Sequence, residues 1–231
     1  MAAKALVAVA TNFKPAALEL VSAFHARTSH EIHLVAGSTG MLYAQLAQGA
    51  PYDVYFAADR ARPARLVGEG LAVAATLQTY AVGQLVLFAA DPEADAPVDE
   101  ATLLAGNFSR LALANPKLAP YGTAALQTLR SLGIEDEMTD KFVYGENVGQ
   151  AYALVATGNA ELGFVARSTL REPDIDNAWP VPAAHHEPVR QDVVLLNKAR
   201  DSQAARAFLA FALGEDGAEI IRAFGYRPAP R

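Results

Sequence analysis

Short apolar runs alternate along this chain with stretches in which apolar residues recur every three or four positions. The runs predict buried parallel strands, and the spaced pattern, as at Leu20 and Phe24, predicts helices with one apolar face. Strands are expected at 5–10, 31–36, 53–58, 85–90, 111–114, 141–144, 162–166 and 192–197. Further helices are expected at 41–48, 62–67, 123–132, 150–156, 202–213 and 215–224.

Strands and helices alternate almost throughout, which is typical of an α/β protein with mostly parallel sheets and helices flanking them. The pattern becomes extended near residue 80 and returns to a strand near residue 192. We therefore predict two lobes joined by hinge crossings near 81–83 and 191–194. Lobe I comprises 1–80 plus 195–231, and lobe II comprises 84–190. Polar loops are expected at 92–97 and, because it holds three prolines, at 171–186.

Clusters of small or neutral polar residues stand where four predicted helices begin, and Thr11 or Asn12 is a natural cap for the first. Backbone N–H groups at a helix start lack partners inside the helix and lie at the positive end of its dipole. Ligands of such sheets bind beyond the carboxyl ends of the strands. The clusters thus predict a cage of neutral donors for a small oxyanion, in a cleft between the lobes. They are Thr11-Asn12, Gly37-Ser38-Thr39-Gly40, Pro120-Tyr121-Gly122 and Asn147-Val148-Gly149.

Composition narrows the classes of partner. The 231 residues are 52% hydrophobic and 19% charged, with a formal net charge of −6, which argues against nucleic acid and anionic membranes as partners. Cysteine is absent, so disulfides and thiolate chemistry are excluded. No apolar run reaches the roughly 18–20 residues that a membrane span needs. Asp53 and Asp59 are interpreted as a strand border and a helix cap rather than an acid–base pair, and we expect no enzyme activity.

The ordered set of motifs resembles the periplasmic molybdate-binding proteins of ABC importers, a branch of the type II solute-binding fold. Motifs of that family run through nearly the whole chain in the family's order and with similar spacing. They are Ala10-Thr11-Asn12-Phe13, Gly37-Ser38-Thr39-Gly40, Gln48-Gly49-Ala50-Pro51-Tyr52-Asp53-Val54, Phe56-Ala57-Ala58-Asp59, Asn115-Pro116, Ala119-Pro120-Tyr121-Gly122, Asn147-Val148-Gly149-Gln150 and Leu162-Gly163-Phe164-Val165.

The resemblance implies binding of molybdate, and of tungstate as well, by hydroxyl and backbone N–H donors, followed by delivery to an ABC membrane permease. It implies a monomer without cofactor or metal-cation ligands, in which molybdenum is bound only as the oxyanion. Because the sequence opens directly into a strand-forming run, we expect no signal peptide in it, and the periplasmic location is implied by the family alone. The implied ligand-binding residues are Thr11, Asn12, Ser38, Thr39, Tyr121 and Val148.

Two departures from the family pattern bear on the site. Thr39 stands where many members have serine, which keeps the hydroxyl and adds a methyl group. The stretch after the Gly-Phe-Val strand holds Ala166 and Arg167 and lacks the tyrosine of some members, so no ligand is assigned there. Two alternatives remain open: the same fold binding another tetrahedral oxyanion such as sulfate, and an enzyme acting on a small anionic substrate.

Overall fold

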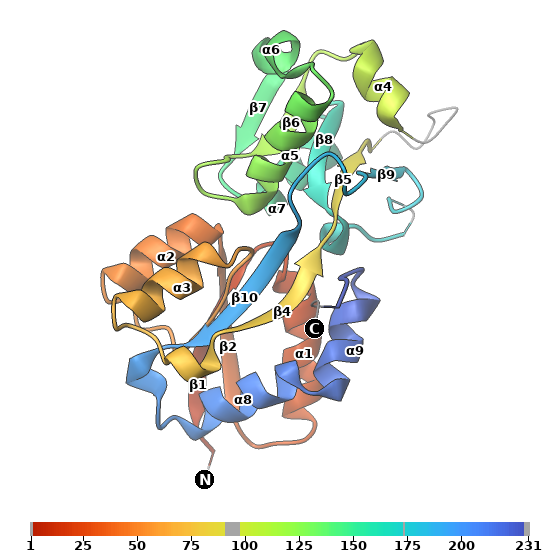
Figure 1. Ribbon diagram of the computed structural model, residues 1–231. Helices are drawn as coiled ribbons and strands as arrows, with labels where there is room; N and C mark the ends of the chain where they lie inside the picture. Colours follow the sequence, from red (N-terminus) through yellow and green to blue (C-terminus); the bar gives the residue numbers. More distant parts are fainter. Residues whose placement is uncertain (1, 91–97, 173, 229–231) are drawn as a thin grey trace. The chain divides into compact units, whose positions relative to one another are not determined.

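The computed structural model describes residues 2–90, 98–172 and 174–228, so the expected loop at 92–97 lies outside the described residues. The chain forms two compact units (Figure 1). The first unit consists of Met1–Gly83 with Arg190–Arg231, and the second of Gln84–Val189. None of the helices among the described residues is both long and apolar enough to cross a membrane.

The first unit is built on a five-stranded sheet with the order β2-β1-β3-β10-β4. Strand β1 pairs in parallel with both β2 and β3, whereas β10 runs antiparallel to β3. The strands are β1 (Lys4–Ala10), β2 (Glu31–Gly37), β3 (Val54–Phe56), β4 (Gln78–Gly83) and β10 (Val189–Leu195). The helices are α1 (Lys14–His25), α2 (Thr39–Ala47), α3 (Ala61–Gly68), α8 (Gln203–Leu213) and α9 (Glu215–Ala223).

Two hydrophobic clusters pack on the two faces of the first sheet. Side chains along a strand belong to them alternately, because successive residues point to opposite faces. Val7 and Val9 of β1 belong to a cluster that includes Leu20 of α1 and Phe208 of α8. Ala8, between them, belongs to a second cluster with residues of α2 and α3. Helices α1, α8 and α9 therefore cover one face of the sheet, and α2 and α3 cover the other (Figure 1).

The second unit repeats this plan with the strand order β7-β6-β8-β5-β9. Strand β6 pairs in parallel with β7 and β8, and β5 pairs antiparallel with β8 and β9. The strands are β5 (Leu85–Phe88), β6 (Leu111–Ala114), β7 (Phe142–Gly145), β8 (Leu162–Ala166) and β9 (Ala178–Pro180). The helices are α4 (Glu100–Ala105), α5 (Pro120–Ser131), α6 (Glu135–Met138) and α7 (Val148–Ala156).

Two sequence expectations need correction. The segment 171–186 is not loop throughout, because its residues 178–180 pair with β5 as a short strand. The mostly parallel sheets agree with the expectation: three neighbouring strands of each sheet are parallel, and the strand next to them runs antiparallel. Neither Thr11 nor Asn12 caps α1: the Phe13 N–H donates to the Ala10 carbonyl over 2.8 Å, so the chain makes a turn first and the helix begins at Lys14.

Candidate functional site

Helix α2 begins directly after β2 and carries the hydroxyl groups of Ser38 and Thr39. Ser38 caps the helix, its Oγ accepting from the Met41 N–H over 3.3 Å. The Thr39 Oγ1 accepts from the Ala58 N–H over 3.1 Å. Both side chains are buried. Each hydroxyl thus acts as an acceptor inside the unit, and within the described ranges no acceptor takes up the proton of either one.

Backbone donors lie at the same helix start. Thr39 and Gly40 are the first two residues of α2, and over the part of the chain that the structure describes their N–H groups meet no acceptor. Such groups carry the positive partial charge of the helix dipole. The beginning of α2 therefore offers up to four neutral donors, two hydroxyl and two backbone, to an anion.

The first polar loop lies next to this helix start. Ala10 at the end of β1 is paired with Gly37 at the end of β2, and the Thr11 N–H donates to the Gly37 carbonyl over 3.1 Å. The structure thereby brings Thr11 and Asn12 together with Ser38 and Thr39 at the carboxyl ends of two adjacent parallel strands.

Asn12 differs from its neighbours because its side-chain amide is engaged within the first unit. Its Nδ2 donates to Gln191 Oε1 and to the Tyr226 hydroxyl, each over 2.9 Å. An amide nitrogen has two protons, so both are used by these contacts. The Asn12 side chain therefore anchors the loop through its Nδ2, and this nitrogen has no proton left for a ligand.

In the second unit, α7 starts after β7 with a reciprocal cap. Asn147 Oδ1 accepts from the Gln150 N–H over 3.0 Å, while Gln150 Oε1 accepts from the Glu146 N–H over 2.7 Å. The N–H groups of Val148 and Gly149, the first two of the helix, have no acceptor among the residues that the structure describes. The Val148 side chain is buried, so its backbone alone can serve a ligand.

Tyr121 lies at the same edge of the second sheet. It is the second residue of α5, which follows β6, and the Asn115 N–H donates to the Gly145 carbonyl over 2.7 Å, joining the ends of β6 and β7. The Tyr121 side chain is almost fully buried. Gly122 allows this approach, since a Cβ there would lie 2.0 Å from the Ala114 carbonyl oxygen. The structure thus places Tyr121 and Val148 on neighbouring loops of one unit.

Asp59 and Arg62, two charged residues that follow β3, are paired with one another. Besides this ion pair, Asp59 Oδ1 accepts from the Arg62 N–H over 3.0 Å, although the N-cap position of α3 is the next residue, Arg60. Burial, and then the charge of Asp59, raises the pKa of Tyr55 well above its ordinary value, so this hydroxyl stays protonated and donates to the Thr39 carbonyl over 2.7 Å. The donor that Tyr55 offers to the start of α2 is therefore neutral.

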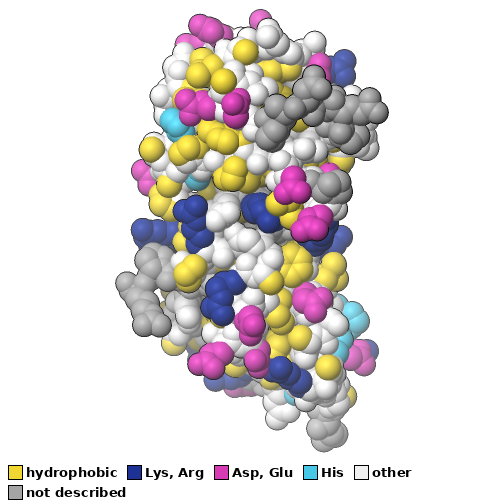
Figure 2. All heavy atoms as spheres, turned by 90° about the vertical axis from the view of Figure 1, so that its right-hand side faces the viewer, with side chains coloured by type: hydrophobic (Ala, Val, Ile, Leu, Met, Phe, Trp, Pro, Cys, Tyr) yellow, Lys and Arg dark blue, Asp and Glu magenta, His cyan; other side chains and the backbone are white. Residues whose placement is uncertain are grey.

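The described residues contain no group of three or more His, Cys, Asp or Glu side chains able to hold a metal ion. On the face drawn in Figure 2, basic side chains stand apart from one another among acidic and apolar ones.

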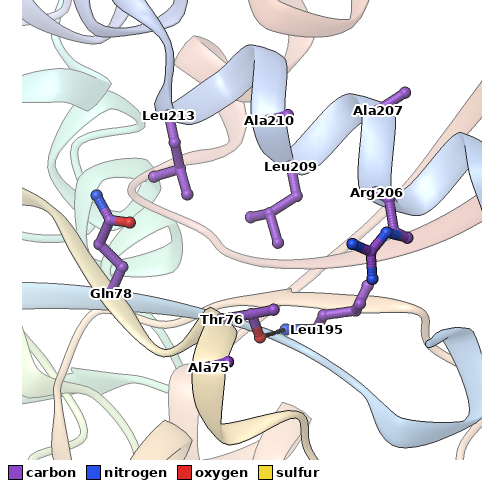
Figure 3. A pocket seen from close by; sticks show the side chains of 9 residues that line it. All are labelled: Ala75, Thr76, Gln78, Leu195, Arg206, Ala207, Leu209, Ala210 and Leu213. Carbon is purple, nitrogen blue, oxygen red and sulfur yellow. Dashed lines mark hydrogen bonds between the residues drawn. The ribbon is translucent and has the colours of Figure 1, made fainter.

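A cavity of about 480 Å³ in the first unit is unrelated to the expected site (Figure 3). It lies between α8 and the segment leading into β4, and none of the six expected ligand residues lines it.

The sequence analysis did not assign Gly40 and Gly149 as ligand-binding residues. Their position as the second residue of α2 and of α7 is the signal that marks them as backbone N–H donors. It also missed Tyr55, which supports the α2 start. Gln191 and Tyr226 were missed as well, and no local signal pointed to them, because they lie far from Asn12 in the sequence.

Comparison with known proteins agrees with the family resemblance found in the sequence. The family model described as bacterial extracellular solute-binding protein matches residues 5–227. The chain belongs to this family. It is similar to the molybdate-binding protein ModA of Rhodobacter capsulatus, with 41% identity over 97% of this chain and 88% of the relative. It is 43% identical to ModA of Azotobacter vinelandii over 97% of this chain and 90% of that protein.

A solved structure gives the same result for the fold. The periplasmic molybdate-binding protein of Azotobacter vinelandii superposes with a TM-score of 0.92 at 34% identity, covering 98% of this chain and 100% of the other. The family resemblance and the α/β solute-binding fold expected from the sequence are confirmed.

Proposed function

We propose that this protein binds molybdate, and tungstate as well, and delivers it to the membrane permease of an ABC importer. The proposal assigns Thr11, Asn12, Ser38 and Thr39 of the first unit, with Tyr121 and Val148 of the second, to oxyanion binding. In this proposal the protein is located in the periplasm, is a monomer, and acts as a binding protein rather than an enzyme. The two relatives described above carry the name molybdate-binding protein ModA.

One observation carries the proposal. Helices α2 and α7 each begin at the carboxyl end of a strand with N–H groups that meet no acceptor among the described residues, and α2 adds two hydroxyl protons. A fully ionised dianion accepts hydrogen bonds and donates none, so a donor-only surface matches it. Hydrogen bonds to a charged group contribute about 1.5–3 kcal/mol each, so six of them contribute about 9 kcal/mol or more and exceed the roughly 8 kcal/mol of a micromolar site.

Neutral donors also account for selectivity. A rigid ring of dipoles discriminates by oxygen–oxygen spacing, so the larger molybdate and tungstate are separated from sulfate by size. Hydrogen phosphate carries an O–H group that finds no acceptor in such a ring, which penalises it.

The test is a calorimetric titration of the protein with molybdate, tungstate, sulfate and phosphate at neutral pH and fixed ionic strength. We expect saturable binding of molybdate and tungstate with one ion per chain, and sulfate at least about tenfold weaker, a difference of about 1.4 kcal/mol. Tighter binding of sulfate than of molybdate would replace the proposed ligand. Absence of any oxyanion binding would remove the proposal.

A further inference from the structure

A buried network of polar side chains surrounds Asn12 in the first unit. Asn12 Nδ2 donates to Gln191 Oε1, and the Tyr80 hydroxyl donates to the same oxygen over 2.8 Å. The Tyr226 hydroxyl accepts from Asn12 Nδ2 and donates to the Asn12 carbonyl, each over 2.9 Å. All four residues are buried, with Gln191 at 0% exposure. Such contacts fix both the side chain and the backbone of Asn12.

Aromatic packing holds the next residue of the loop in the same place. The Phe13 ring lies 4.6 Å from that of Tyr80 and 5.8 Å from that of Tyr226, measured between centroids, and it stacks on Phe56 at 5.1 Å. The rings of Tyr80 and Tyr226 thus pack against Phe13, while their hydroxyls form hydrogen bonds within the polar network. The loop that follows β1 has little freedom to rotate.

The network also reaches the second polar loop of this unit, Ser38-Thr39 at the start of α2. The Tyr80 hydroxyl lies 3.2 Å from the Ala57 carbonyl oxygen. The next residue, Ala58, donates its N–H to Thr39 Oγ1. A continuous chain of contacts therefore runs from Asn12 through Gln191 and Tyr80 to the hydroxyl at the start of α2.

Gln191 and Tyr80 stand on the two strands by which the chain passes between the units. Tyr80 belongs to β4, shortly before the boundary between Gly83 and Gln84. Gln191 belongs to β10, directly after the boundary between Val189 and Arg190. The support of both polar loops is thus anchored on the connecting strands.

From this geometry we propose that Gln191 is a positioning residue for oxyanion binding, which rests on the function proposed above. Its Oε1 holds the Asn12 amide, and through it the 11–12 loop, with the Thr11 hydroxyl, keeps one conformation. Gln191 contacts no ligand itself. Preorganised donors bind more tightly than donors that must be ordered when the ligand arrives.

The experiment compares two substitutions on the connecting strands. Gln191→Met keeps the volume of the side chain and removes the acceptor. Thr79→Val is the matched control: the Thr79 hydroxyl donates to Asp192 Oδ1 over 2.6 Å, which joins β4 and β10 without touching Asn12. We expect Gln191→Met to weaken molybdate binding by about tenfold or more, and Thr79→Val to change it by less than about twofold. Thermal unfolding without ligand confirms that both variants are folded.

A double-mutant cycle separates positioning from a general loss of structure. Because Gln191 holds the 11–12 loop through Asn12, Gln191→Met added to Asn12→Ala should weaken binding clearly less than Gln191→Met alone, the remaining effect passing through Tyr80. Tyr226→Phe, with Tyr52→Phe as its control, gives a second test if Gln191→Met fails to fold. Tyr52 donates to Gln45 Oε1 over 2.8 Å, away from the network.

The outcomes distinguish the two proposals. If the unmodified protein binds an oxyanion and the variants at 191 or 226 bind it as well as it does, the positioning role alone is overturned. An equal loss in Thr79→Val, or fully additive effects with Asn12→Ala, also overturns it. If the unmodified protein binds none of the four oxyanions, the proposed function fails and the positioning role with it.

Discussion

The backbone N–H of Ala58 donates to the Thr39 hydroxyl oxygen over 3.1 Å, and this contact determines where the hydroxyl proton can go. Because the oxygen already accepts a hydrogen bond inside the unit, its proton is directed to another acceptor. At the start of α2 the proposed acceptor is an oxygen of the dianion. Thr39 is therefore held as a donor before the ligand arrives.

We predict that Thr39→Val weakens molybdate binding by about ten- to a hundredfold, because one hydrogen bond to a charged oxygen is worth about 1.5–3 kcal/mol. Thr39→Ser keeps the hydroxyl and should bind within about threefold of the unmodified protein, a difference of roughly 0.7 kcal/mol. Calorimetric titration of both variants measures this. Equal affinities for the valine and serine variants would remove the Thr39 side chain from the site.

Tyr121 provides the corresponding prediction for the second unit. Its side chain is buried at the start of α5, so Tyr121→Phe removes the hydroxyl and leaves the packing nearly unchanged. We expect molybdate affinity to fall by about tenfold, the cost of one lost hydrogen bond. Titration gives the affinity, and urea unfolding reports the stability. An unaltered affinity would mean that only the backbone of this loop contributes.

The close approach of α5 to β6 predicts a strong effect of one added methyl group. A Cβ at Gly122 would lie 2.0 Å from the Ala114 carbonyl oxygen and 3.0 Å from the Pro116 nitrogen. Gly122→Ala should therefore displace the start of α5, lower the unfolding free energy by more than about 2 kcal/mol and impair oxyanion binding. The matched control is Gly68→Ala in α3, where a Cβ meets nothing within 4 Å. Urea unfolding that ranks the two variants equally would contradict this account.

The sequence pattern predicted much of the fold because continuous apolar runs indicate where buried strands lie. The strands at 111–114 and 162–166 were predicted to the residue. Strand β9 was missed, since its three residues, which end on Pro180, are too few to show a pattern of their own. The antiparallel direction of β5 and β10 was missed too, because an apolar run indicates a strand but not the direction in which it pairs.

For the candidate site, local chemistry pointed to the loops but not to what supports them. Small polar residues after strands mark the starts of α2 and α7, as a cap requires. Asn12 looked like one more such cap. Its actual partners, Gln191 and Tyr226, lie 179 and 214 positions away, and only the folded chain brings them together.

The last prediction concerns alkaline pH and the Tyr55 hydroxyl. Burial, and then the charge of Asp59, raises the pKa of Tyr55 well above its ordinary value, and the protonated hydroxyl donates to the Thr39 carbonyl. In the unfolded chain a tyrosine ionises near pH 10, whereas in the folded protein Tyr55 resists ionisation. Its contribution to stability is therefore complete below about pH 10 and is lost as the pH rises from there towards the raised pKa.

We expect Tyr55→Phe to lower the unfolding free energy by about 1 kcal/mol at neutral pH, the usual net value of one hydrogen bond. This difference should stay constant up to about pH 9 and shrink above about pH 10, since only the unmodified protein gains an ionisable group on unfolding. Urea unfolding of both proteins across this range measures it, with Tyr52→Phe as a control at a tyrosine that is not fully buried. A difference that widens with rising pH would mean that Tyr55 ionises more readily in the folded protein than in the unfolded chain.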